Sequence, residues 1–355
     1  MAEKTARRFV NLQIVRGLAA LSVVLYHAAL FTSERSHATW IAEVFSGRFG
    51  FYGVLTFFVL SGFLMEGAVR RYNAPTFFAH RVVRLFPTYW MVFLIIQGVQ
   101  VARLQQWQPI PWSALTLLPL GTIYRPLHIE WTMVYELFFY FVCTLLCFKK
   151  SVFPWVLAGW GCICAGTLFW FNQYGTELQP HWFAIPFSGW NIGFILGGLA
   201  GYVHRKWSQL PRQALLFAGV IAVLLGEAVG LPSRLIFSSF GIATLLLVVV
   251  TGRDIGLDGV ITRALFTLGE YSYGLYLIHA MTILIILQYV PANRISEPLS
   301  LFVGLVASGL IAGIIAGSID IWIYAKLKRR VDRFFKRRSS PIDNPPVVDG
   351  RREGA

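Results

Sequence analysis

Ten stretches of about 20 mostly apolar residues follow one another along this chain of 355 residues, and each is long enough to cross a bilayer as a helix. They lie roughly at 11–31, 50–69, 83–102, 130–148, 152–171, 183–203, 213–231, 234–251, 264–289 and 299–325. Charged residues make up only 14% of the chain, against about 25% in ordinary soluble domains. The sequence therefore predicts an all-α polytopic integral membrane bundle of about ten transmembrane helices.

The positions of lysine and arginine predict how these helices are oriented. With a cytoplasmic N-terminus, 24 of the 31 Lys and Arg residues fall in cytoplasmic segments and six on the outer side. An excess of Lys and Arg is typical of cytoplasmic loops. We therefore expect both termini in the cytoplasm and the chain in the cell (inner, cytoplasmic) membrane. The net charge of +14 then reflects the topology of a chain that spans the lipid bilayer, and no nucleic-acid partner is expected.

The organisation along the chain is simple. Residues 1–330 form the predicted transmembrane domain, and residues 331–355 form a basic, proline-containing cytoplasmic tail that we expect to be disordered. The four cysteines lie in apolar runs without metal-ligand spacing to histidines, so the sequence predicts no metal site. No internal repeat is visible, and nothing in the sequence fixes an oligomeric state.

The first apolar stretch carries two ionisable residues, Arg16 and His27. Eleven residues separate them, which is about 16 Å along a helix. An ionisable side chain inside a membrane span is costly, which makes each of them a candidate functional residue. The predicted topology places Arg16 near the cytoplasmic edge and His27 toward the outside.

Two further ionisable residues, Glu136 and His279, fall at a depth similar to that of His27 when depth is counted from the predicted span ends. A carboxylate beside an imidazole fixes its tautomer and stabilises its charged form, which favours general-base chemistry. The alternative is that each is a polar residue satisfied by helix packing, and for His279 the two interpretations stay open.

The segment after the second stretch carries Arg81 and Arg84, which share a face if the segment is helical. Guanidinium groups bind phosphates in a bidentate manner, so this face suits a phosphorylated donor at the membrane surface. The alternative is that Arg81 and Arg84 are ordinary basic residues that flank a span on its cytoplasmic side. Pro87, shortly beyond, fits a kink or a change of direction. In the second stretch, Ser61-Gly62 permits close approach of a ligand or another helix.

Five groups of residues occur in one order along the chain. They are Arg16-Gly17-Leu18-Ala19-Ala20 with His27, Gly53-Val54 with Phe57 to Leu64, Arg81 to Trp90, Trp131-Thr132 with Glu136 and Phe138 to Tyr140, and Gly269 to His279. Together they resemble the motifs of acyltransferase family 3, membrane proteins that O-acylate cell-surface sugars and related acceptors. No GxSxG, HExxH or Walker motif accompanies them, so ATP-driven chemistry is not indicated.

The resemblance implies an acyl-CoA donor, usually acetyl-CoA, from the cytoplasm, a carbohydrate or glycolipid acceptor on the outer side, and no permanently bound cofactor. It implies His27, Glu136 and Arg16 as catalytic residues and Arg81 and Arg84 as the acyl-CoA site. Candidate pocket residues are Ser61, Trp131, Tyr135, Tyr276 and His279.

One departure from the family concerns the second stretch. Many members carry an acidic residue after Gly-Val, where this chain has Leu55-Thr56, so a carboxylate role there is not transferred.

The main alternative function is a transporter of a small metabolite or lipid-linked sugar. His27, Glu136 and His279 would then form a proton relay inside the membrane. A structural scaffold has little support, because a scaffold does not need charges in the membrane interior. For the enzyme, direct transfer to the acceptor and a covalent acyl-histidine both remain open.

Overall fold

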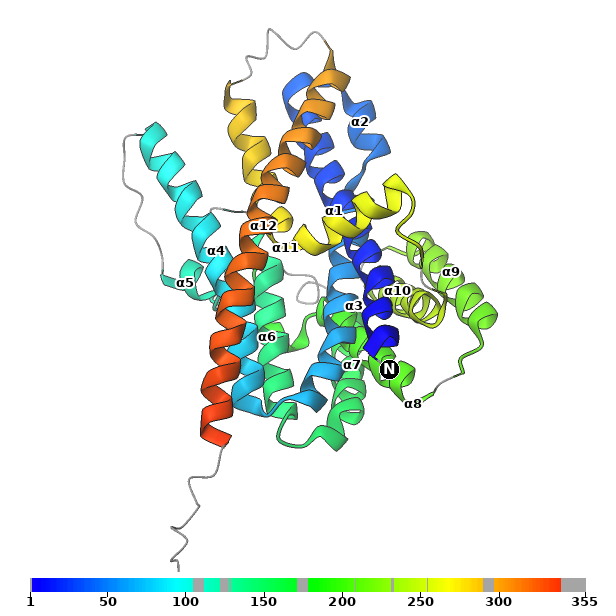
Figure 1. The fold of residues 1–355 in the computed structure, drawn as a ribbon. Helices are drawn as coiled ribbons and strands as arrows, with labels where there is room; N and C mark the ends of the chain where they lie inside the picture. Colours follow the sequence, from blue (N-terminus) through cyan, green and yellow to red (C-terminus); the bar gives the residue numbers. More distant parts are fainter. Residues whose placement is uncertain are drawn as a thin grey trace, which may run out of the picture.

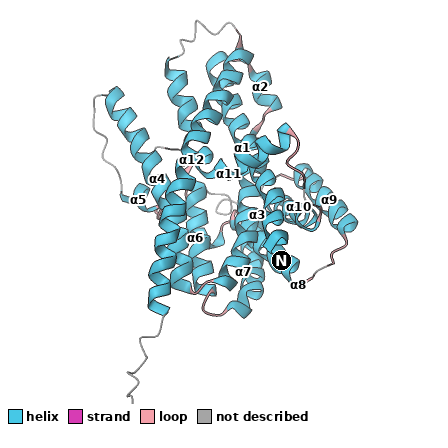
Figure 2. Cartoon of the chain, viewed as in Figure 1, coloured by secondary structure: helices cyan, strands magenta, loops and turns pink. Residues whose placement is uncertain are grey.

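The computed structural model describes residues 2–104, 112–121, 127, 129–170, 178–207, 209–230, 233–253, 255–289 and 297–339. Within these ranges the chain is helical, with one isolated β-bridge between Leu120 and His181 (Figure 2). The long helices are α1 (Ala2–Ser36), α3 (Gly47–Arg71), α4 (Ala74–Leu104), α6 (Glu130–Leu146), α7 (Phe153–Trp170), α8 (Asn191–Lys206), α9 (Arg212–Ala228), α10 (Ser233–Thr251), α11 (Val260–Tyr289) and α12 (Pro298–Ser339). Short helices are α2 (Thr39–Val44), α5 (Trp112–Thr116), η1 (Lys150–Val152) and η2 (Ile185–Phe187).

Each of the ten predicted spans overlaps one of the long helices, which confirms the all-α class. Seven helices of the described chain are long and apolar enough to cross a membrane. The other three, α6, α8 and α9, have 17, 16 and 17 residues. The chain is therefore a multi-pass membrane protein, while the count of ten spans and the orientation of the termini stay predictions.

Two details differ from the sequence-based boundaries. The sixth predicted span begins at residue 183, whereas α8 begins at Asn191, because Pro186 lies in the short helix η2 and the chain turns after it. The Asn191 amide donates to the Ile185 carbonyl, 2.7 Å away, and holds this turn. Pro87 lies inside α4, which continues through it, so Arg81 and Arg84 are helical residues, as their shared face requires.

The predicted tail at 331–355 overlaps the end of α12, which continues to Ser339. Residues 340–355 of that tail lie outside the described residues.

Glycines let pairs of helices approach at backbone distance. A Cβ atom at Gly17 in α1 would lie 1.9 Å from the Leu265 carbonyl oxygen, and one at Gly269 in α11 would lie 1.9 Å from the Gln13 carbonyl oxygen. The α3–α8 pair uses the same device, since a Cβ at Gly62 or Gly197 would lie 2.0 Å from a carbonyl oxygen of the other helix. The first of these contacts fixes α1 against α11, on which the site is built.

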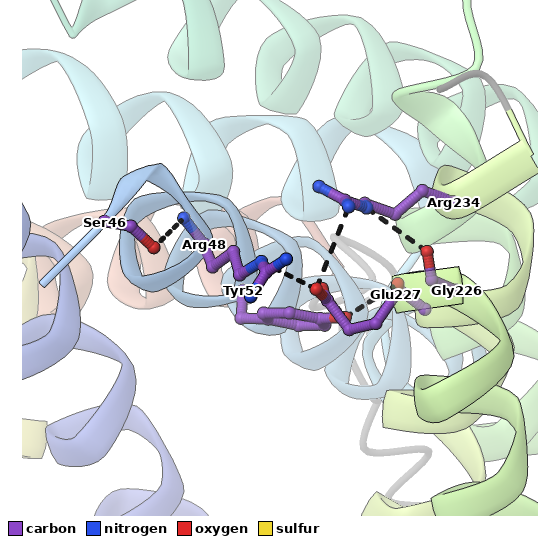
Figure 3. A network of polar contacts seen from close by, with 7 residues as sticks. Ser46, Arg48, Tyr52, Gly226, Glu227 and Arg234 are labelled. Carbon is purple, nitrogen blue, oxygen red and sulfur yellow. Dashed lines mark hydrogen bonds and ion pairs between the residues drawn. The ribbon is translucent and has the colours of Figure 1, made fainter. Parts of the chain in front are cut away.

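A polar network fastens the α9–α10 hairpin to the start of α3 (Figure 3). Glu227 of α9 pairs with Arg48, at 2.7 Å, and accepts a hydrogen bond from the Tyr52 hydroxyl, also at 2.7 Å. Arg234 of α10 lies 3.8 Å from the same carboxylate and donates to the Gly226 carbonyl at 3.2 Å. The hairpin lies on one side of the molecule, whereas α4 and α12 lie on the opposite side (Figure 1).

Candidate functional site

A cavity of about 170 Å³ lies among α1, α3, α4, α6, α8 and α11. It brings together six residues singled out in the sequence, namely Arg16, Ser61, Arg81, Arg84, Glu136 and Tyr276. Hydroxyl groups of Thr132, Tyr140, Ser272 and Tyr273 also line it, and the remaining lining is apolar. Three guanidinium groups against one carboxylate make the cavity suited to an anionic ligand that also has an apolar part.

Arg84 is held from the side away from the cavity by α12. Its Nη1 donates to Asp320 Oδ2 at 2.6 Å, and the Thr88 hydroxyl donates to the other carboxylate oxygen at 2.7 Å. The guanidinium also lies over the rings of Tyr273 and Tyr324, at 4.7 and 5.2 Å from their centroids. This set of contacts orients Arg84 and compensates its charge.

Asp320 is a residue that the sequence-based reasoning missed. It is buried in the last apolar stretch, at 1% exposure. The criterion that selected His27, an ionisable residue inside a membrane span, applies equally to Asp320 and was sufficient to find it.

Arg81 is held differently from Arg84. It lies between the rings of Phe77 and Tyr140, with its guanidinium carbon 5.6 and 5.5 Å from their centroids. Its Nε is buried, and no group in the described part of the chain accepts a hydrogen bond from it. A buried N–H donor without an acceptor is unfavourable, so a hydrogen bond from Arg81 Nε to an anionic ligand in the cavity would be favourable.

Arg16 and Glu136 complete the charged lining. Arg16 donates to the Ser272 hydroxyl of α11 at 2.7 Å and to the Gln13 side chain at 3.1 Å. Glu136 accepts from the Tyr140 hydroxyl and, at 3.4 Å, from the Ser61 hydroxyl. Both residues are therefore anchored by neighbours within the cavity wall.

The sequence-based expectation paired Glu136 with His27, whereas the structure places Glu136 in the lining of the cavity and His27 beside His279. The expectation counted depth from a membrane surface at Glu130, but Glu130 is fully buried and accepts from the Leu127 amide at 2.8 Å. Helix α6 thus begins inside the protein, which places Glu136 at the level of the arginines.

His27 instead meets His279. Nδ1 of His27 lies 3.2 Å from Nε2 of His279, and the ring centroids are 5.0 Å apart. Nδ1 of His27 also lies 3.0 Å from the Val23 carbonyl, and Nδ1 of His279 lies 2.9 Å from the Leu275 carbonyl. Neither histidine is among the residues that line the cavity. Tyr276 connects the two regions, because it lines the cavity and its ring lies 5.9 Å from that of His279.

The two remaining candidate pocket residues, Trp131 and Tyr135, belong to an aromatic cluster beside the cavity. The Tyr135 hydroxyl donates to the Ser188 hydroxyl at 2.9 Å, and its side chain is fully buried. Trp131 packs against Trp190, with ring centroids 5.0 Å apart. Neither side chain is among the cavity-lining residues.

Leu55 is the first of the two residues, Leu55-Thr56, at which the sequence departs from the expected acidic residue after Gly53-Val54. It is fully buried, and its side chain packs on Gly193 of α8. An apolar residue therefore fits this position well, and the charged lining of the cavity comes from other helices.

The fold and the cavity define a multi-pass helical membrane protein in which three half-buried arginines surround a partly apolar space between the helices. The comparison with known families is more specific. The chain belongs to acyltransferase family 3, since the acyltransferase domain of that family matches residues 9–317. The resemblance based on the five motifs is thereby confirmed, and the protein is an enzyme that acts as an acyltransferase.

Curated relatives agree with this assignment. "Acyltransferase MdmB" of Streptomyces mycarofaciens is 26% identical over 78% of this chain and 79% of its own length. "Nodulation protein 10" of Rhizobium leguminosarum bv. viciae is 23% identical over 76% of this chain and 82% of its own. "Putative acetyltransferase ORF330" of Acidianus two-tailed virus is 24% identical over 75% and 81%. No solved structure matches the chain.

Proposed function

We propose that the protein is a membrane-bound O-acyltransferase. It moves an acyl group, by default acetyl, from cytoplasmic acyl-CoA to a hydroxyl of a cell-surface or exported carbohydrate or glycolipid. The observation that carries the proposal is the cavity in which Arg16, Arg81 and Arg84 surround a partly apolar space. Two of the relatives are named as an acyltransferase and a putative acetyltransferase, which supports transfer of an acyl group and in particular of acetyl.

In this proposal the cavity receives the donor. Arg81, with its buried Nε, and Arg84, fixed by Asp320, bind the phosphate groups of CoA. The pantetheine arm follows the apolar wall formed by Phe57, Phe58 and Leu60. Glu136 balances part of the positive charge and holds the Tyr140 and Ser61 hydroxyls, a role different from orienting the imidazole.

The chemistry takes place near His27. The acceptor hydroxyl oxygen attacks the thioester carbonyl carbon while its proton moves to His27, which acts as general base. The carbon–sulfur bond then breaks, and the CoA thiolate takes the proton from His27 to leave as the free thiol. The products are the O-acyl ester and CoA, and His27 returns to its neutral form.

The orientation belongs to the same proposal. Ten spans with both termini in the cytoplasm put Arg81 and Arg84 in the cytoplasmic half of the bundle and His27 toward the outer half. The membrane is then the cell's inner, cytoplasmic membrane, with the donor on one side and the acceptor on the other.

Transfer of label from radioactive acetyl-CoA to surface glycans, measured with purified protein in proteoliposomes, tests this function. His27→Ala is expected to lower kcat by a factor of about 100 or more, the usual contribution of a general base. The double variant Arg81→Ala with Arg84→Ala is expected to raise the KM for acetyl-CoA at least about tenfold, because charged hydrogen bonds are lost.

Arg71→Ala is the matched control. Arg71 is an exposed arginine at the C-terminal end of α3, close to the start of α4, and it does not line the cavity. Near-full transfer by His27→Ala would refute the role of the base. An unchanged KM in the double arginine variant would refute the donor site.

A further inference from the structure

The contact between His27 and His279 joins the two long helices α1 and α11 at a level beyond the cavity. We propose that His279 is a positioning residue for His27: its Nε2 accepts a hydrogen bond from His27 Nδ1–H and thereby fixes the tautomer in which His27 Nε2 is the base. The inference rests on the proposed function, in which His27 takes the proton of the acceptor.

The tautomer of His279 follows from its backbone partner. Its Nδ1 lies 2.9 Å from the Leu275 carbonyl oxygen, which only accepts hydrogen bonds. Nδ1 of His279 therefore carries the hydrogen. A neutral imidazole has one N–H group, which leaves a lone pair on Nε2, the atom that faces His27.

The tautomer of His27 follows in turn. Its Nδ1 lies 3.0 Å from the Val23 carbonyl oxygen and 3.2 Å from Nε2 of His279, and both of these atoms are acceptors. Nδ1 of His27 therefore carries the hydrogen, and this N–H group donates to both acceptors. The lone pair of the neutral ring is consequently on Nε2, the nitrogen that receives the acceptor proton.

The same contact gains strength during the reaction. When the acceptor proton reaches His27 Nε2, the ring becomes an imidazolium, and its Nδ1–H becomes a charge-assisted donor to His279. When the thiolate removes that proton, the ring is neutral again in the same tautomer. His279 remains neutral throughout and supplies the orienting acceptor that the sequence had assigned to Glu136.

The framework around the pair is rigid. Gly17 and Gly269 bring the α1 and α11 backbones together, and Arg16 donates to Ser272 between the same two helices. His279 is fully buried, and Tyr276, one turn earlier in α11, holds the Thr132 hydroxyl of α6 at 2.8 Å. An imidazole so enclosed keeps its orientation with little further loss of entropy.

The test compares two variants of His279 in the purified full chain, with radioactive acetyl-CoA as donor. His279→Gln places an amide oxygen where Nε2 was, so it keeps an acceptor for His27 Nδ1–H. His279→Leu removes that acceptor at similar volume. We expect the Leu variant to lose a factor of about 100 in kcat with the KM for acetyl-CoA within about twofold of the unmodified protein, and the Gln variant to retain most of kcat.

Thr282→Val is the matched control, because it removes a polar group one turn away on α11, where the hydroxyl donates only to the Ile278 carbonyl. If the Leu variant does not fold, His279→Asn replaces it, since its amide reaches the Nδ1 position and not the Nε2 position. Equal losses in the Gln and Leu variants, or an undiminished kcat in the Leu variant, would overturn the inference. Failure of the unmodified protein to transfer label from any acyl-CoA is a different result, which refutes the donor and this inference with it.

Discussion

At the scale of single residues, the site depends on how a few charges are compensated. Arg84 lies against a carboxylate that is 1% exposed, and that carboxylate also accepts from Thr88. Removal of one member of a buried ion pair leaves the other uncompensated, which costs more than the pair itself contributes. Asp320 therefore affects both the stability of the bundle and the position of Arg84.

Asp320→Asn is expected to destabilise the protein by about 3 kcal/mol and to raise the KM for the donor, because the Arg84 guanidinium loses its charged partner. Thermal unfolding in detergent and donor titration measure the two effects. Asp332→Asn is the control, since Asp332 lies in the same helix as Asp320 and pairs with His80 of α4, but its side chain is 42% exposed.

Addition of Arg84→Gln to Asp320→Asn removes the uncompensated charge. The double variant is expected to be less destabilised than the sum of the two single variants. Strict additivity would show that the two side chains do not interact.

The sequence predicted which residues line the site better than it predicted which side chains those residues contact. Arg16 and Glu136 were selected because charges in apolar stretches are costly, and Arg81 and Arg84 because their spacing gives them a shared helical face. The cavity contains all four. Glu136 was the expected neighbour of His27, whereas the structure places His279 beside it. Depth along a helix does not determine the rotation of that helix or the level at which it begins. Side-chain pairs between helices depend on both.

At the scale of elements, close helix pairs depend on glycine. Gly197 of α8 faces the backbone of α3, where a Cβ would lie 2.0 Å from the Val59 carbonyl oxygen. Hydropathy predicted both helices but not their contact, because a window average does not register which face a glycine occupies. A window average also missed the late start of α8, since it does not register the turn after Pro186.

Gly197→Ala is expected to destabilise the protein by about 2 kcal/mol or more, because the two helices must separate to accept the methyl group. Gly159→Ala is the matched control, as nothing lies within 4 Å of its Cβ position. In that control, replacement of glycine inside a helix is expected to be neutral or to stabilise by about 0.5–1 kcal/mol. Equal unfolding temperatures for the two variants would contradict the close contact.

At the scale of the whole molecule, ten spans are predicted from the apolar stretches, and their orientation is predicted from the distribution of Lys and Arg. Three of the ten main helices in the described part of the chain, α6, α8 and α9, have only 16 or 17 residues. Helices α6 and α8 pack among several neighbours, and α9 packs on α10. The short helices are predicted to cross the bilayer as well, because an odd number of spans would put one end of the chain outside.

Single cysteines test this arrangement in a chain whose four native cysteines are replaced. Glu43→Cys, in α2, is expected to react with a membrane-impermeant maleimide in intact cells, because α2 follows the outer end of α1. Asn73→Cys and Asp258→Cys, at exposed positions between helices, are expected to react only after permeabilisation. Labelling of all three in intact cells would contradict the predicted topology.

The length of α6 has a consequence for how a chemical group passes from one side of the membrane to the other. Its 17 residues extend about 25 Å, less than the roughly 30 Å of hydrocarbon in a typical bilayer, and it begins at the fully buried Glu130. Residues outside α6 must therefore fill the remaining depth of the bilayer at this place. In the proposed function, an acyl group transferred beside this helix passes from donor to acceptor inside the protein, so the exchange requires no open aqueous pore.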